Sequence, residues 1–164
     1  MRKLIVAVAS AAHLLPHSFG ISPVGATAVY GAAYGRSRLF WLAPLVPLLL
    51  GNILFGFYEP LVWVFVYGGF ALSSLAARLL LRNGRTVRSY SSAIVAGAVV
   101  FFLVSNFSVW LAGYYPQNVA GLVACYINGL PYLALALLVD SAYSLVFVSL
   151  HQMLDEQPLL PSRA

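Results

Sequence analysis

The chain has 164 residues, of which 62% are hydrophobic and only 8% are charged, and its formal net charge is +5. A soluble domain has about 25% charged residues, so this composition excludes a water-soluble globular protein. The basic residues are dispersed over separate gaps between apolar runs, which excludes a nucleic-acid-binding patch. Since the apolar runs show no alternation of polar and apolar residues, they predict membrane helices rather than a β-barrel.

The first two apolar runs, Leu4–Leu15 and Val24–Gly35, are shorter than a membrane span, which needs about 20 residues. Pro16 and Pro23 bracket a polar turn between them. We predict a tilted helix pair or helices that extend into the turn, with a re-entrant hairpin as the alternative. The start of the chain also resembles a signal peptide, but we expect it to be retained as the first crossing.

Three longer runs follow along the chain. Leu39–Phe57 is interrupted by Pro44 and Pro47, which are expected to bend a membrane helix. Leu61–Leu81 is the most uniform run, and Ser92–Leu111 ends in aromatic residues typical of a membrane interface. Each of the three runs predicts a membrane-spanning helix.

The last apolar region, Val119–Leu150, is too long for one membrane helix of ordinary tilt. Gly129 and Pro131 are expected to break it. The sequence therefore predicts a short partial helix over Asn118–Asn128, followed by a sixth span over Leu130–Leu150.

Six crossings place all nine lysine and arginine residues on one face of the membrane. Such residues are retained on the cytoplasmic side. We therefore predict an all-α integral membrane protein with a six-helix bundle in the bacterial inner membrane and both termini in the cytoplasm. Residues 1–154 form one transmembrane domain, and residues 155–164 form a flexible cytoplasmic tail.

Asp140 is the only acidic residue in the middle of a predicted span. A carboxylate at that depth is expected to face the bundle interior or a polar cavity. It has either a structural hydrogen-bonding role or a role in binding a ligand or proton. Polar residues of other spans and of the outer face predict a small-molecule pocket around it, although interfacial aromatics and loop caps are an alternative explanation. The candidate ligand-binding residues are His17, Asn52, Tyr58, Glu59, Asn106, Trp110, Asn118 and Asp140.

Small residues spaced four apart let two helix backbones approach closely in a membrane. Ala7 and Ala11 form one such pair, and Gly31 and Gly35 form another. Either pair serves internal packing or the docking of a partner membrane protein.

Enzymatic and metal-binding motifs are not found. The single cysteine, Cys125, excludes an internal disulfide. His13 and His17 have the spacing of a helical metal pair, but Pro16 lies between them and no third ligand is near. With four acidic residues and three histidines in the chain, we predict neither an enzyme nor a metal or cofactor site.

Two stretches resemble a family of uncharacterised small bacterial membrane proteins. The first runs from Leu15-Pro16-His17 to Tyr34-Gly35, and the second runs from Phe101-Phe102 through Gly129-Leu130-Pro131 to Asp140. That family is similar to the substrate-binding S-components of energy-coupling factor vitamin transporters, which have six helices and cytoplasmic termini. The resemblance implies that Ala7 and Ala11 dock to a membrane coupling subunit, and that the ligand lies beneath the outer loops.

The leading hypothesis is a membrane subunit that captures a vitamin-like or cofactor-like nutrient for an uptake system and has no chemistry of its own. The alternative is a structural accessory subunit of a larger membrane complex, in contact with protein, lipid or pigment.

Overall fold

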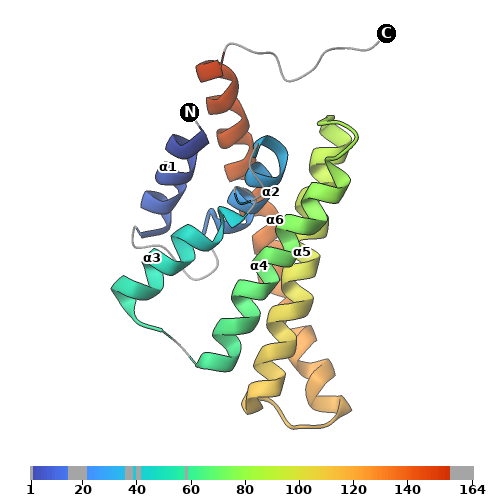
Figure 1. The fold of residues 1–164 in the computed structure, drawn as a ribbon. Coiled ribbons are helices and arrows are strands. Elements are labelled where there is room, and N and C mark those ends of the chain that lie inside the picture. Colours follow the sequence, from blue (N-terminus) through green and yellow to red (C-terminus); the bar gives the residue numbers. More distant parts are fainter. Residues whose placement is uncertain (1, 15–21, 36–38, 40–41, 58, 156–164) are drawn as a thin grey trace.

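The computed structural model describes residues 2–14, 22–35, 39, 42–57 and 59–155, and all of its regular structure is helical. The described residues form six α-helices, labelled in Figure 1, and one π-helical turn, η2, between α5 and α6. The elements are α1 (Arg2–Leu14), α2 (Val24–Tyr34), α3 (Leu45–Phe55), α4 (Pro60–Leu80), α5 (Val87–Val109), η2 (Trp110–Tyr114) and α6 (Val119–Asp155).

Among the residues that the structure describes, three helices are long and apolar enough to cross a membrane: α4, α5 with its π-helical turn, and α6. The prediction of an all-helical membrane protein is thus supported. The helices α1, α2 and α3 have 13, 11 and 11 residues. At 1.5 Å per residue they are about 16–20 Å long, which is less than the hydrocarbon core of a bilayer. Six crossings therefore remain a prediction.

The long helices carry their large apolar side chains on the outside. In α4, Leu72, Leu75 and Leu79 are exposed, whereas Gly69 and Ser73 are buried. A soluble protein has the opposite arrangement, because its large apolar side chains leave water. The pattern fits a helix whose outer face contacts lipid and whose inner face packs through small residues.

The helices α4 and α5 pack side by side along most of their length. The hydroxyl of Ser73 donates to the carbonyl oxygens of Gly97 in α5 and of Gly69 in its own helix, each at 2.8 Å. A Cβ atom added to Gly69 would lie 3.2 Å from the ring of Phe101. Small residues on α4 therefore permit the close approach of α5.

The centre of the bundle is α2, which contacts each of the other five α-helices and is buried along nearly its whole length. Near its C-terminal end, the hydroxyl of Tyr30 and Nδ1 of His151 in α6 share a hydrogen bond of 2.9 Å. The rings of Tyr34 and His151 lie 4.1 Å apart, and Phe147 packs against Tyr30. These contacts fix one end of α2 to α6.

The span expected over Leu39–Phe57 is wrong in its length. Among the described residues of this run, the α-helix covers Leu45–Phe55, with Pro44 as the preceding residue and Pro47 in the first turn. The first amides of a helix have no intrahelical partner, so proline costs little there. The two prolines therefore lie at the start of a shorter helix instead of bending a longer one.

The break expected at Gly129 and Pro131 is also wrong. α6 is continuous over 37 residues with Pro131 inside it, which corresponds to about 55 Å. Asn118 therefore precedes the helix, and the rest of the expected partial helix forms the first turns of α6. Proline removes one backbone hydrogen bond, and membrane helices tolerate this loss when neighbouring groups satisfy the freed carbonyl.

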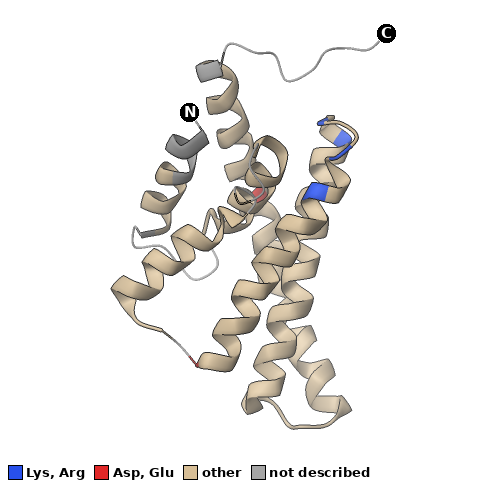
Figure 2. Ribbon diagram, viewed as in Figure 1, with Lys and Arg blue, Asp and Glu red and all other residues tan. Residues whose placement is uncertain are grey.

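The beginning of α1, the α4–α5 connection and the end of α6 lie at the same end of the molecule. The described arginines gather at this end, as Figure 2 shows, and we call it the arginine end. One of them, Arg85, lies 5.0 Å above the ring of Tyr34. The predicted positions of Arg36 and Arg38 and of the tail beyond Asp155 lie outside the described residues.

Candidate functional site

A cavity of about 860 Å³ lies inside the bundle. Its walls come mainly from α2, α4, α5 and α6, with single contributions from α1 and α3. The exposed residues Glu59 and Tyr114 also line it. The cavity therefore reaches the surface near η2, opposite the arginine end (Figure 1), and we call this the η2 end.

Asp140 of α6 lies at the N-terminal end of α2 and is only 8% exposed. The residue before α2, Pro23, provides no side-chain cap, and the carboxyl group of Asp140 lies directly against Gly25 in the first turn, beside the backbone of Ala26. The N-terminus of a helix carries partial positive charge and free amides. The carboxyl group of Asp140 therefore faces the positive end of α2 from another helix, which gives a physical reason for a carboxyl group at this depth.

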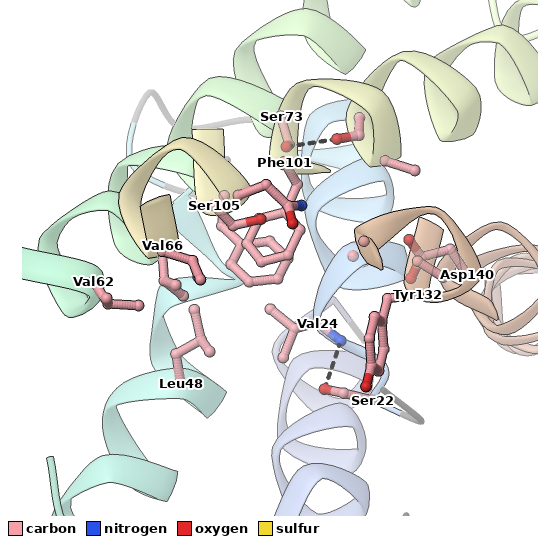
Figure 3. Close-up of a pocket in the computed structure, with 18 of the residues that line it drawn as sticks. Ser22, Val24, Leu48, Val62, Val66, Ser73, Phe101, Ser105, Tyr132 and Asp140 are labelled. Carbon is pink, nitrogen blue, oxygen red and sulfur yellow. Dashed lines mark hydrogen bonds between the residues drawn. The ribbon is translucent and has the colours of Figure 1, made fainter. Parts of the chain in front are cut away.

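Gly25 makes this contact possible. A Cβ atom at this position would overlap the carboxyl group of Asp140. Figure 3 shows Asp140 and Tyr132 on the side of α6 that faces α2, with Val24 between them and the opposite wall.

His13 brings α1 to the same region of the cavity. Its Nδ1 shares a hydrogen bond of 2.9 Å with the hydroxyl of Ser22, and that hydroxyl also accepts a longer bond from the amide of Val24, at 3.4 Å. A Cβ atom at Gly51 would lie 2.9 Å from Nε2 of His13. The histidine thus joins the start of α2 to α3.

Asn106 of α5 lines the cavity closer to the η2 end. Its side-chain amide donates to the carbonyl oxygen of Phe102 at 2.8 Å. Its side-chain oxygen lies against Gly129 of α6, where a Cβ atom would overlap it. The thiol of Cys125 donates to the Asn106 backbone carbonyl at 3.3 Å. Asn106 therefore joins α5 to α6 and keeps its side-chain oxygen as an acceptor.

Glu59 lines the cavity at its mouth. One oxygen of its carboxylate accepts the amide of Val62 at 2.9 Å and so caps α4. The other oxygen remains available to solvent or to a ligand.

Trp110 and Asn118 are predicted site residues that do not line the cavity. The indole of Trp110 donates to the carbonyl oxygen of Pro116 at 3.0 Å, and the side-chain oxygen of Asn118 accepts the amide of Gly121 at 2.8 Å. Gly113 has φ +85°, which lets the chain reverse after η2. Both side chains thus hold the turn that connects α5 to α6.

Asn52 does not line the cavity either. It is buried, and its amide donates to the hydroxyl of Tyr67 at 3.0 Å. The expected convergence of Asn52, Asn106 and Asp140 is therefore reduced to the last two, and these lie at different levels of the bundle. His17 and Tyr58 lie outside the described residues.

Other residues that line the cavity were not among the predicted ligand-binding residues, although their spacing along each helix could have indicated them. In α6 the lining positions return every three or four residues before Asp140, which is the period of one helix face. They are Cys125, Asn128, Gly129, Tyr132 and Ala136 in α6, with Gly97, Phe101 and Ser105 at the same spacing in α5.

Within the part of the chain that the structure describes, no three His, Cys, Asp or Glu side chains lie close enough to hold one metal ion. The lining is mostly apolar, with a few carboxyl, hydroxyl and amide groups. Such a lining suits an organic molecule with a small number of directed hydrogen bonds.

The model of a family of unknown function, DUF6580, matches residues 1–162, and the chain belongs to this family. The prediction of a family of uncharacterised proteins is thus confirmed. No curated protein and no solved structure matches the chain.

Proposed function

We propose that this member of a family of unknown function is the small-molecule-binding subunit of a membrane uptake system and catalyses no reaction itself. The observation that carries the proposal is the cavity of about 860 Å³. Sites for small molecules typically have volumes of 300–1,000 Å³ and apolar walls with few polar groups. This cavity has both properties and reaches the surface at the η2 end.

The proposal includes six passages through a bacterial inner membrane, in an arrangement like that of energy-coupling factor S-components. The long helices supply three passages, and α1, α2 and α3 with their connections supply the others. The arginine end faces the cytoplasm, because lysine and arginine are retained there during insertion. The ligand then enters from the outside, at the η2 end.

The surface of α1 supports docking to a coupling subunit. Ala7 and Ala11 are both exposed, whereas Ala9 is fully buried. In contrast, Gly31 is buried and Gly35 is half-buried, so that pair serves packing within the bundle. An exposed pair of small residues lets a partner helix approach closely in the membrane.

The test is purification of the tagged full-length chain from native membranes in a mild detergent. Mass spectrometry then identifies both retained small molecules and co-purified proteins. We expect an organic compound in stoichiometric amount, together with a membrane coupling subunit and ATPases.

A matched pair of variants locates the binding site. Ala136 lines the cavity, whereas Ala134 of the same helix is exposed and does not. Ala136→Phe places an aromatic ring in the cavity and should weaken retention, and Ala134→Phe should leave it unchanged. Equal retention by both variants would mean that the cavity is not the site. Recovery in a stable larger complex without a small molecule would instead support the accessory-subunit role.

A further inference from the structure

We infer that the ligand carries a positively charged nitrogen, such as a primary amine, on an elongated apolar body, with the nitrogen next to Asp140. This inference rests on the proposed function, because it names the chemical class that the same cavity takes. It depends on three properties of the lining: its charge, its hydrogen-bonding groups and its shape.

The lining holds more acidic than basic side chains. Of the described residues that line the cavity, Glu59 and Asp140 are carboxylic acids, His13 is an imidazole that shares a hydrogen bond with Ser22, and none is lysine or arginine. A carboxylate at membrane depth is costly unless an opposite charge or several donors face it. The N-terminal end of α2, against which the carboxyl group of Asp140 lies, provides part of that compensation. A cationic group in the cavity adds to it, whereas a carboxylate or phosphate would repel both acids.

Two polar groups in the middle of the lining use their donors within the protein. The hydroxyl of Ser73 donates to backbone carbonyls, and the amide of Asn106 donates to the Phe102 carbonyl. The side-chain oxygen of Asn106 and the carboxyl oxygens of Asp140 and Glu59 can accept further hydrogen bonds. A ligand that complements these acceptors supplies N–H or O–H donors, and the two acidic groups favour a charged N–H donor.

The shape of the cavity separates two polar levels. Asn106 lies against Gly129, and Asp140 is 11 residues further along α6, which corresponds to about 16 Å. Between these levels α6 contributes Tyr132 and Ala136 to the wall, and the rest of the lining is mostly apolar and includes Val66, Phe70 and Phe101, of which Figure 3 labels Val66 and Phe101. The ligand that fits is therefore long, apolar in its middle and cationic at the end next to α2.

Three indole compounds with one apolar body and different charges test the inference. Tryptamine is cationic, tryptophol is neutral and indoleacetate is anionic near neutral pH. Binding of each to the purified full-length chain is measured by equilibrium dialysis. We expect tryptamine to bind about tenfold more tightly than tryptophol, as for one partly buried charge pair, and indoleacetate to bind least.

Two carboxyl variants then assign this preference to one residue. Asp140→Asn keeps the side-chain shape and an acceptor for α2 but removes the charge, so it should bind tryptamine and tryptophol equally. Glu59→Gln removes the other lining carboxylate, at the exposed mouth, and should keep most of the preference. Thermal unfolding of both variants checks that the fold is retained.

Several outcomes would overturn the inference. If indoleacetate binds as tightly as tryptamine, the ligand class is wrong, while the proposed function stands on the co-purification experiment. If Asp140→Asn keeps the full preference, the nitrogen does not lie next to Asp140. If none of the three compounds binds to the wild-type chain, an amine on an apolar body is not sufficient and the inference fails. If the chain purified from native membranes retains no small molecule, the proposed function itself fails.

Discussion

The α4–α5 contact and the α2–α6 contact both depend on glycine, but for different reasons. In the first, Gly69 allows the side chains of α5 to approach the backbone of α4, and the two helices pack along most of their length. In the second, Gly25 leaves room for the carboxyl group of Asp140. The first contact is continuous, whereas the second is made by a polar group near one end of α2 and an aromatic–histidine cluster near the other.

This difference explains where the cavity forms. Small residues facing one another leave no space between helices, and α4 and α5 pack closely around Ser73 and Gly97. Phe70 and Phe101 face the cavity, and their stacked rings lie 4.1 Å apart. With α2 fixed to α6 mainly near its two ends, the space beside it remains open. A buried polar contact and a ligand cavity are therefore parts of one arrangement.

The largest expected effect comes from Gly25→Ala. The added methyl group overlaps the Asp140 carboxyl, and overpacking of this kind costs about 3 kcal/mol in the free energy of unfolding. Denaturant unfolding in detergent measures the loss.

The control and the mechanism are tested together. Gly68 has open space around its Cα, so Gly68→Ala should be neutral or stabilising. If the overlap causes the loss, combining Gly25→Ala with Asp140→Ala should cost less than the sum of the two single changes. Strict additivity would show that Gly25 does not act through Asp140.

A smaller effect is expected at Gly69, in the continuous contact. A Cβ atom there would lie 3.2 Å from Phe101 and 3.4 Å from Val104, which requires both side chains to shift. Alanine stabilises a helix by about 1 kcal/mol relative to glycine, but the crowding outweighs this gain. Gly69→Ala should therefore lower the free energy of unfolding by about 1 kcal/mol net. The neighbouring Gly68→Ala should be neutral or stabilising, so an equal loss at the two positions would contradict a close α4–α5 contact.

The sequence predicts much of the fold because an apolar run indicates a segment that contacts lipid, and a gap with basic residues indicates a segment that contacts water. The run over Leu61–Leu81 differs from α4 by one residue at each end. Errors arise at proline, since Pro44 and Pro47 shorten α3 while Pro131 leaves α6 unbroken. The identity of a proline does not reveal whether its missing amide falls in a first turn or in a helix interior.

The candidate site was predictable only in part. Asp140 and Asn106 line the cavity as expected, but Asn52 finds its partner in Tyr67 instead. A polar residue in an apolar run indicates that a hydrogen-bond partner is needed. It does not indicate which helix supplies that partner, because the partner depends on packing between segments that are distant in sequence.

The smallest expected effect is that of Ser73→Ala in the continuous contact. The change removes the hydrogen bond to Gly97 but adds no volume, and such interhelical bonds in membrane proteins contribute about 0.6 kcal/mol. Ser141 is the matched control, because it is exposed and its hydroxyl donates only within α6, to Leu137. Ser141→Ala should change the free energy of unfolding by less. If both variants lose the same stability, the α4–α5 contact depends on backbone proximity alone, and the serine between the two helices is not needed to hold them together.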